Sequence, residues 1–359
     1  MATEEAPVKS DGKPEGVLYV GVDFGTSRTS IAASNGVRET TLSYVGYPKD
    51  VVAMKLLKKD KLFGQEALDK QLSLNLFRPL AEGCIKYSAD GKTPEGKVYD
   101  DNVKAAKDLL LHAIALAKAR KDELIYGVVG APAQAQIKNK KAIIDACREC
   151  LDSVMICSEP FAVAYGIDRL EDVLVIDIGA GTTDLCRMHG TMPEESDQIT
   201  LPNAGDWLDQ QLNGLFQKTC VGASFTINMV KQIKEKYAFV TEPSSRANVE
   251  FPVNGKPTKF DLTDEMKEGC SRIVPPIVDG LQKLIASFHP EFQAKLRNNV
   301  LLAGGGSQIV GLDVAIERYM EEHLGGGKVT QIEEPMYGGA NGALKIAHDM
   351  PAEYWEKLK

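Results

Sequence analysis

Two short segments, far apart in the chain, carry the same arrangement of acidic, glycine and hydroxyl residues. One contains Asp23, Gly25, Thr26 and Ser27, and the other contains Asp177, Gly179, Ala180, Gly181, Thr182 and Thr183. An apolar run precedes each aspartate and another run follows, which is typical of a β-hairpin. Glycine lets backbone N–H groups approach phosphate oxygens, and the hydroxyls add donors. Two such hairpin tips predict a nucleotide held between two duplicated halves.

The aspartates predict a cation beside the phosphates. Asp23 and Asp177 would repel a bare triphosphate, so they suit the site only if a positive ion is present. Mg²⁺ keeps several of its waters and is often held through one or two carboxylates. We therefore expect Mg²⁺ at Asp23 and Asp177, bound through water.

A glycine turn near the C-terminal end supports the same interpretation. Gly304, Gly305, Gly306 and Ser307 follow a strand expected over 299–303. Such a turn lets a flat base lie against the backbone, with the next helix N-terminus nearby. The chain has no GxxxxGK[ST] motif, and 325–328 (Gly-Gly-Gly-Lys) is followed by valine, so we interpret it as a loop.

The elements that must position these residues alternate along the chain. Periodicity predicts strands over 17–22, 28–34, 37–42, 124–129, 154–157 and 299–303, with another near 328–332. It predicts helices over 64–74, 101–118, 134–151, 206–219, 224–236, 263–288 and 339–347, and another from Pro160. Asn254-Gly255 predicts a type I′ hairpin turn. Strands alternating with helices predict an α/β fold with parallel sheets flanked by helices.

Bulk properties describe a globular chain of two lobes. Its 359 residues exceed one ordinary core, 43% are hydrophobic, and the net charge of −8 argues against a nucleic-acid partner. No apolar stretch approaches the roughly 20 residues that span a bilayer. The N-terminus lacks the order of a signal peptide, so we expect a cytoplasmic protein. Residues 1–16 are expected to form a disordered tail.

Three weaker features leave alternatives open. Cys147 and Cys150 have the spacing of a metal-ligand pair, but no second pair follows, and packed thiols one helical turn apart are favoured. The lysine-rich run 55–61 could meet a membrane surface, although a solvated edge is favoured. Glu159 could simply satisfy free N–H groups at a helix start.

Further segments carry a family resemblance, which covers about 17–347. They are 77–83 (Arg-Pro-x-x-x-Gly at 78–83), 204–209 (Ala-Gly-Asp-x-x-Asp) and 230–236 (Lys-Glu at 234–235). Together with the hairpins and the glycine turn, they resemble the actin, Hsp70 and sugar-kinase ATPase superfamily. These segments resemble the bacterial actins of the MreB type. Finer similarity at 45–51, 158–161 and 351–355 resembles the MamK family of magnetosome-associated actin-like filament proteins.

The resemblance implies roles for individual residues. Asp23 and Asp177 would hold hydrated Mg²⁺, Lys234 and Glu235 would touch ribose and adenine, and Glu159 would orient the attacking water. The β- and γ-phosphates would be wrapped by Gly25, Thr26, Ser27, Gly179, Ala180, Gly181, Thr182 and Thr183. Gly304, Gly305 and Gly306 would flank the nucleoside, and the nucleotide-binding set also includes Gly205, Asp206 and Ser307. Eukaryotic actin has a phosphate-binding lysine at the position of Ser30 in this chain. MreB-type proteins also lack this lysine, so its absence favours the bacterial branch. Whether Arg28 contacts the phosphates stays open.

The resemblance also implies an organisation and a function. The first lobe would comprise 17–165 and 333–359 with an insert at about 44–84, and the second 166–332 with an insert at about 206–262. We expect an ATPase that binds ATP, ADP and Mg²⁺ and polymerises head to tail into cytoplasmic filaments. Magnetosome chains and their acidic linker proteins would be partners. A small-molecule kinase of the same fold is the alternative, and an Hsp70-like module is disfavoured because the peptide-binding domain is missing.

Overall fold

The computed structural model describes residues 16–86, 96–132, 137–243 and 245–358. Apart from Gly16, the expected N-terminal tail lies outside these residues. The chain divides into two compact units, one of Met1–Asp168 with Tyr337–Lys359 and the other of Arg169–Met336. The expected divisions at 165/166 and 332/333 fall close to these boundaries. Among the described residues, no helix combines the length and apolar character that crossing a membrane requires.

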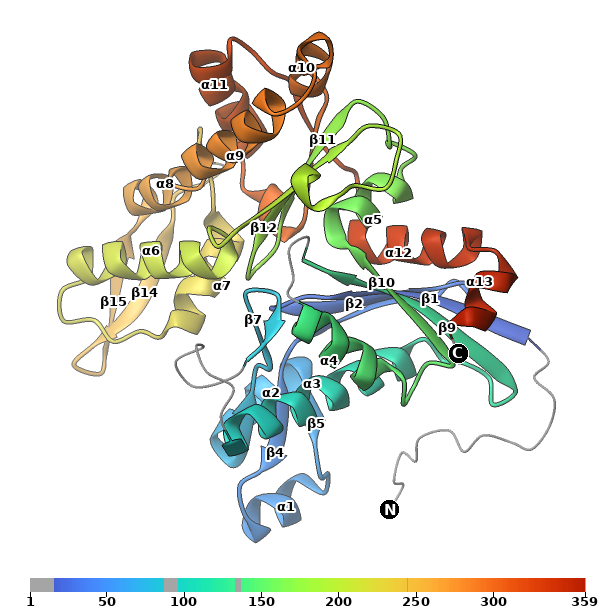
Figure 1. Ribbon diagram of the computed structural model, residues 1–359. Helices are drawn as coiled ribbons and strands as arrows, with labels where there is room; N and C mark the ends of the chain where they lie inside the picture. Colours follow the sequence, from blue (N-terminus) through green and yellow to red (C-terminus); the bar gives the residue numbers. More distant parts are fainter. Residues whose placement is uncertain (1–15, 87–95, 133–136, 244, 359) are drawn as a thin grey trace. The chain divides into compact units, whose positions relative to one another are not determined.

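Unit 1 is built on a five-stranded sheet with helices on both faces (Figure 1). Its strands are β1 (Gly16–Phe24), β2 (Arg28–Ala33), β3 (Arg38–Leu42), β9 (Glu123–Ala131) and β10 (Ser153–Ser158). Helices α3 (Gly96–Leu116) and α4 (Ile137–Cys147) lie on one face, and α5 (Glu159–Gly166) and α12 (Gly338–Asp349) on the other. Leu18, Val20 and Val22 alternate along β1 into the core on the α3 side. Tyr19 and Asp23 therefore face α12, and α13 (Ala352–Lys357) adds Trp355, whose ring lies 6.3 Å from that of Tyr19.

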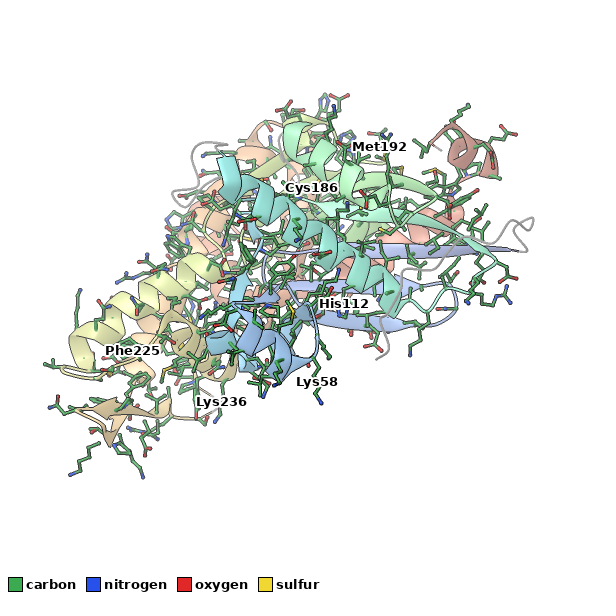
Figure 2. All side chains as sticks on the ribbon, turned by 90° about the horizontal axis from the view of Figure 1, so that it is seen from below. Lys58, His112, Cys186, Met192, Phe225 and Lys236 are labelled. Carbon is green, nitrogen blue, oxygen red and sulfur yellow. The ribbon has the colours of Figure 1, made fainter. Side chains whose placement is uncertain are left out.

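A small insert follows β3 in unit 1. It contains β4 (Val45–Pro48), α1 (Val51–Leu57), β5 (Leu62–Phe63), α2 (Gly64–Asp69), η1 (Gln71–Ser73) and β6 (Leu74–Phe77), followed by the hairpin β7 (Leu80–Ala81) and β8 (Cys84–Ile85). Phe63 stacks on His112 of α3 at 4.1 Å, which ties the insert to this helix (His112 is labelled in Figure 2). The predicted helix over 64–74 is too long, because the chain leaves it at Asp69 and enters β6.

Unit 2 repeats the sheet of unit 1. Its strands are β11 (Val173–Ile178), β12 (Thr183–Met188), β13 (Gln198–Leu201), β16 (Val300–Ala303) and β17 (Val329–Gln331). The order β3-β2-β1-β9-β10 in unit 1 matches β13-β12-β11-β16-β17 in unit 2. In both, an antiparallel hairpin is extended by one antiparallel strand on one side and by two parallel strands on the other. The expected α/β fold with two duplicated sheets is confirmed.

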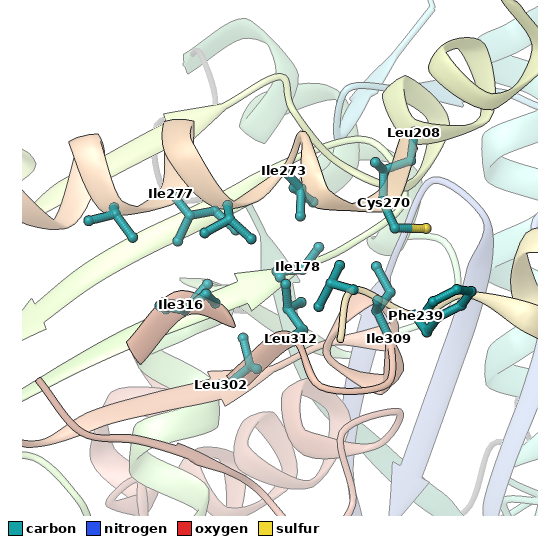
Figure 3. Close-up of a cluster of buried hydrophobic side chains, with 14 of the residues drawn as sticks. Ile178, Leu208, Phe239, Cys270, Ile273, Ile277, Leu302, Ile309, Leu312 and Ile316 are labelled. Atoms are coloured by element: carbon teal, nitrogen blue, oxygen red, sulfur yellow. The ribbon is translucent and has the colours of Figure 1, made fainter. Parts of the chain in front are cut away.

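Helices and a hairpin cover the core of unit 2. They are α6 (Gly205–Thr219), α7 (Ile227–Tyr237), α8 (Thr263–Ser271), α9 (Val274–Ala286), α10 (Pro290–Arg297), α11 (Leu312–Leu324), β14 (Asn248–Val253) and β15 (Lys256–Asp261). Figure 3 shows side chains of β11, β16, α6, α8, α9 and α11 meeting in this core. Phe225 (Figure 2) stacks at 4.6 Å on Phe251 of β14 and so joins the β14–β15 hairpin to the core of unit 2. Positive φ angles at Asn254 and Gly255 agree with the predicted type I′ turn.

Two of the helices predicted from the sequence differ in the structure, one because it is divided and one because it ends earlier. The single helix over 263–288 is wrong, since α8 ends at Ser271 and α9 begins with Pro275 and Pro276 in its first turn. Proline lacks the N–H that a helix interior needs, so it starts a helix rather than continuing one. The helix over 134–151 ends at Cys147, and its first residues lie outside the described part of the chain.

Candidate functional site

The first phosphate hairpin of unit 1 has a tight tip. Strands β1 and β2 pair from Val20 with Ala33 to Phe24 with Thr29, so the chain turns at Gly25, Thr26 and Ser27. A Cβ placed on Gly25 would lie 2.6 Å from the carbonyl oxygen of Arg28, which leaves room only for glycine.

Contacts from outside the hairpin hold this tip in place. Ser43 Oγ donates to the Gly25 carbonyl at 2.7 Å, and Arg78 Nε donates to the Thr26 carbonyl at 2.9 Å. Carbonyl and following N–H point in opposite directions in a trans peptide, so the N–H groups of Thr26 and Ser27 point away from these donors. The Thr26 hydroxyl itself accepts from the Gly83 N–H at 3.1 Å. The Thr26 hydroxyl oxygen thus helps to hold the tip, and the backbone N–H groups of Thr26 and Ser27 are turned toward the other side.

Asp23 and Glu159 lie on either side of one glycine. Asp23 is paired with Gly130 of β9, and Glu159 begins α5 directly after β10. A Cβ placed on Gly130 would lie 3.3 Å from Glu159 Cγ and 4.0 Å from Asp23 Cα. Burial first, and then the charges of Glu159 and Asp23, raise the pKa of the nearby Cys157 thiol to about 12. The structure thus places Glu159, the predicted water-orienting residue, and Asp23, the predicted metal-binding residue, around the same glycine.

Asp23 should make the stability of the nucleotide-free protein depend on pH. Burial raises the pKa of Asp23 from 3.8 to about 6. Between these values the folded state holds the proton more tightly than the unfolded chain, so ionisation lowers the free energy of unfolding as pH rises. In urea titrations without nucleotide, we expect Asp23→Asn to gain on the order of 2 kcal/mol over the wild type between pH 4 and 6. If the difference in free energy of unfolding between Asp23→Asn and the wild type stays constant from pH 4 to 6, the raised pKa of Asp23 would be contradicted.

The second phosphate hairpin lies in unit 2 and has the same construction. Gly179 N–H donates to the Thr182 carbonyl at 2.9 Å, which closes the tip between β11 and β12. Thr182 and Thr183 are buried, and the Thr183 hydroxyl donates to the Asn203 carbonyl at 2.7 Å. As in unit 1, a hydroxyl that the sequence suggested as a phosphate donor is used to hold the tip.

The glycine turn of 304–307 packs directly on this hairpin. Asp177 of β11 is paired with Ala303 of β16, so the turn begins beside the aspartate. Gly304 has a φ of +76°, and a Cβ there would lie 2.3 Å from Asp177 Oδ1. Ser307 Oγ donates back to the Gly304 carbonyl at 2.7 Å. Unit 2 thus unites Asp177, the hairpin tip and the glycine turn.

The start of α6 and the end of α7 complete the set in unit 2. Gly205 N–H donates to the Gly179 carbonyl at 3.1 Å, and Asp206 N–H to the Ala180 carbonyl at 2.7 Å. Lys234 of α7 is largely buried and contacts α6, whereas Glu235 is exposed. The roles of these residues toward a nucleotide stay predictions.

Sequence reasoning missed several of these supports. Ser43 carries no motif signal toward the phosphate hairpins. Arg78 and Gly83 lie in the Arg-Pro-x-x-x-Gly segment, and Asp209 ends the Ala-Gly-Asp-x-x-Asp segment, so these two segments could have suggested them. Ser30, where actin has its lysine, is buried and its hydroxyl lies 2.9 Å from that of Thr40.

The weaker sequence features lie elsewhere. All seven cysteines are free, and Cys150 Sγ donates to the Cys147 carbonyl at 3.2 Å. Burial raises the pKa of the Cys150 thiol to about 12. Within 16–86, 96–132, 137–243 and 245–358, no three His, Cys, Asp or Glu side chains gather as a metal site would require. In the lysine-rich run, Lys59 pairs with Glu66 and Lys61 with Asp108.

A pocket of about 470 Å³ opens in unit 2 at the other end of β12, away from the phosphate hairpin. At its wall Arg187 forms a buried ion pair with Asp197 at 2.5 Å and lies over the ring of Phe288. Burial alone would raise the pKa of Asp197, but hydrogen bonds from the Glu194 backbone, Arg187 and His189 outweigh it and lower the pKa.

Two duplicated sheets, each with a glycine-rich hairpin beside an aspartate, define the actin-like ATPase fold. A family model for MreB/Mbl proteins matches residues 19–353. The chain belongs to this family.

Within the family the chain is similar to MamK. The actin-like protein MamK of Paramagnetospirillum magneticum is 34% identical over 350 residues, which cover 98% of each chain. A solved MamK double helical filament matches 93% of this chain and 99% of its own, with a TM-score of 0.87 and 35% identity. A non-polymerising MamK mutant bound to AMPPNP matches the same shares of the two chains, with a TM-score of 0.69 and 34% identity.

Proposed function

We propose that this protein binds Mg–ATP through both phosphate hairpins, hydrolyses it, and assembles head to tail into filaments. The observation that supports the nucleotide most is the repetition of one device in both units. In each hairpin tip, donors from other segments bind the backbone carbonyls, and the glycines lie beside an aspartate. The similarity to a MamK bound to AMPPNP supports the same ligand.

The residues present suit a hydrated Mg²⁺. A Cβ on Gly339 would lie 3.1 Å from Asp23 Oδ2, and one on Gly304 would lie 2.3 Å from Asp177 Oδ1, so a glycine at each position keeps a neighbouring side chain off the carboxylate. Asp23 and Asp177 would hold Mg²⁺ through water, and the ion would neutralise charge on the transferred phosphoryl group. The two hairpin tips would position the phosphates, and Glu159 would orient the attacking water.

Filament assembly is supported by the MamK filament structures and by an exposed apolar face of the insert. We define the α1 face as Val51, Val52, Met54 and Leu56. Val51 and Val52 are 80% and 76% exposed, and Leu56 is 70% exposed. A soluble monomer seldom concentrates such side chains at one place, so a partner surface is indicated. Lysines surround this face, including Lys58, labelled in Figure 2.

The pocket in unit 2 offers a surface of complementary chemistry. Phe288 and Pro290 line it, Met192 lies nearby in sequence and is 66% exposed, and Glu194 and Glu195 supply negative charge at the same loop. The α1 face of one copy, apolar and with basic neighbours, is therefore suited to bind at the unit 2 pocket of a second copy of this chain. A contact between two different surfaces leaves both ends open and generates a filament.

Val52→Asp should prevent assembly without affecting folding, because the side chain is exposed in the monomer. We expect the critical concentration for ATP-dependent sedimentation to rise at least about tenfold, the cost of placing one charge in an apolar contact. Val221→Asp, at a valine that is 79% exposed in unit 2, is the matched control and should sediment like the wild type. Normal pelleting of Val52→Asp would remove α1 from the contact. A sugar-dependent burst of ADP without sedimentation would favour a kinase instead.

The family resemblance extends the proposal to the cell. Cytoplasmic filaments of this protein would position magnetosome chains, with acidic linker proteins on those organelles as partners.

A further inference from the structure

A buried ion pair ties the first turn of α6 to α7. Lys234 Nζ lies 2.7 Å from Asp209 Oδ1 and donates to the Gly205 carbonyl at 2.5 Å. The two side chains are only 12% and 4% exposed. One ammonium thus joins the first residue of α6 to the residue one turn later.

The turn held in this way supports the second phosphate hairpin. Gly205 and Asp206 donate their N–H groups to the carbonyls of Gly179 and Ala180. In a planar trans peptide the next N–H points the opposite way, so the N–H groups of Ala180 and Gly181 are turned away from α6. Any shift of the α6 start would therefore rotate the donors at the hairpin tip.

Stability alone does not account for this pair. Replacing a buried ion pair by packed apolar residues is often neutral or stabilising, whereas removing one partner leaves a costly buried charge. Burial raises the pKa of Asp209, and the Lys234 ammonium acts in the opposite direction. The pair is better explained by what it holds in place.

We propose that Asp209 and Lys234 are positioning residues for the phosphates of the nucleotide. They hold the α6 start against Gly179 and Ala180 and thereby orient the donors of the hairpin tip. This inference rests on the proposed binding of ATP. It differs from the role that the family resemblance implies for Lys234, a direct contact with ribose and adenine.

The test compares ligands with and without phosphates. Affinities for ADP and for adenosine are measured by competition against a fluorescent ADP analogue, for Asp209→Asn, Lys234→Met and the double variant. We expect each single variant to weaken ADP about tenfold and to leave adenosine within about twofold. The double variant should be no weaker than the worse single variant, because both residues act through one contact.

Controls separate the proposal from loss of folding and from loss of the proposed function. Glu268→Gln, which removes the exposed pair with Arg272, should leave ADP affinity unchanged. Asp209→Glu keeps the buried charge and its partner, so it should fold even if Asp209→Asn does not, and it should still weaken ADP. Equal loss of adenosine and ADP in Lys234→Met, or additive effects in the double variant, would overturn the proposal. Failure of the wild type to bind ADP would instead reject the proposed function.

Discussion

Asp177→Asn should lower the affinity for Mg–ATP by roughly 30- to 100-fold. The substitution keeps the shape of the side chain and removes its charge, which we expect to hold hydrated Mg²⁺. A hydrogen bond to a charged group contributes about 1.5–3 kcal/mol, and each 1.4 kcal/mol is tenfold in affinity. A Cβ on Gly304 would lie 2.3 Å from Asp177 Oδ1, so the glycine is needed for this carboxylate to keep its position. Calorimetric titration with ATP in Mg²⁺ measures the effect.

The same titration in EDTA separates the cation from the phosphates. Without Mg²⁺ we expect Asp177→Asn to bind ATP at least as well as the wild type, since the Asp177 carboxylate then repels the bare triphosphate and the variant lacks this charge. Asp172→Asn is the matched control, because this carboxylate lies just before the same strand and pairs with Lys295 at 3.1 Å. Equal loss with and without Mg²⁺ would show that Asp177 acts on the fold of the hairpin instead.

The phosphate hairpins could be predicted because their chemistry is local. Aspartate, glycine and hydroxyl residues stand within a few positions of each other, and the flanking apolar runs fix the strands. Arg78 and Asp209 lie in recognisable motifs, but the contacts by which such residues hold the tips could not be predicted, because they join distant segments. Ser43 and Arg78 reach the first tip, and Asp209 reaches the second only through Lys234. Such contacts depend on tertiary packing, which no spacing in the sequence encodes.

Helix α1 shows a second limit of sequence reasoning. Its sequence, Val-Val-Ala-Met-Lys-Leu-Leu, is apolar nearly all round, and such a segment is normally buried. The structure buries Ala53 and leaves four larger side chains exposed. Its start is nevertheless chemically clear, since Asp50 caps it by accepting from the Ala53 N–H at 2.8 Å. Burial within one copy cannot be predicted when a second copy provides the covering surface, as we propose.

The pair of tips also explains why the duplicated sheets are asymmetric in their supports. Unit 1 holds its tip with side chains, from Ser43 and Arg78, whereas unit 2 uses the N–H groups at the start of α6. Both solutions direct carbonyls backward and N–H groups forward. The common requirement is therefore the orientation of the peptide planes, and it can be met by unrelated residues.

Glu159→Gln should slow ATP hydrolysis about 100-fold while the affinity for ATP changes less than about twofold. Glutamine keeps the size of the side chain but cannot accept a proton from the attacking water, and positioned proton acceptors contribute about 10²- to 10⁴-fold. Glu159 lies across Gly130 from Asp23, and all three residues belong to unit 1. Phosphate release after ATP addition measures the rate, and sedimentation over time should show filaments that persist.

A carboxylate at a helix start can also act only on the helix, and a matched variant tests this. Glu291 occupies the first turn of α10 as Glu159 does in α5, and it lies in the other unit. If the carboxylate of Glu159 serves only the free N–H groups of its helix, Glu159→Gln and Glu291→Gln should have similar small effects on stability and none on turnover. A selective loss of turnover in Glu159→Gln, with an unchanged melting temperature, assigns the residue to the reaction. Unchanged phosphate release would show that Glu159 serves only the start of its helix. Another carboxylate near Asp23 would then have to accept the proton.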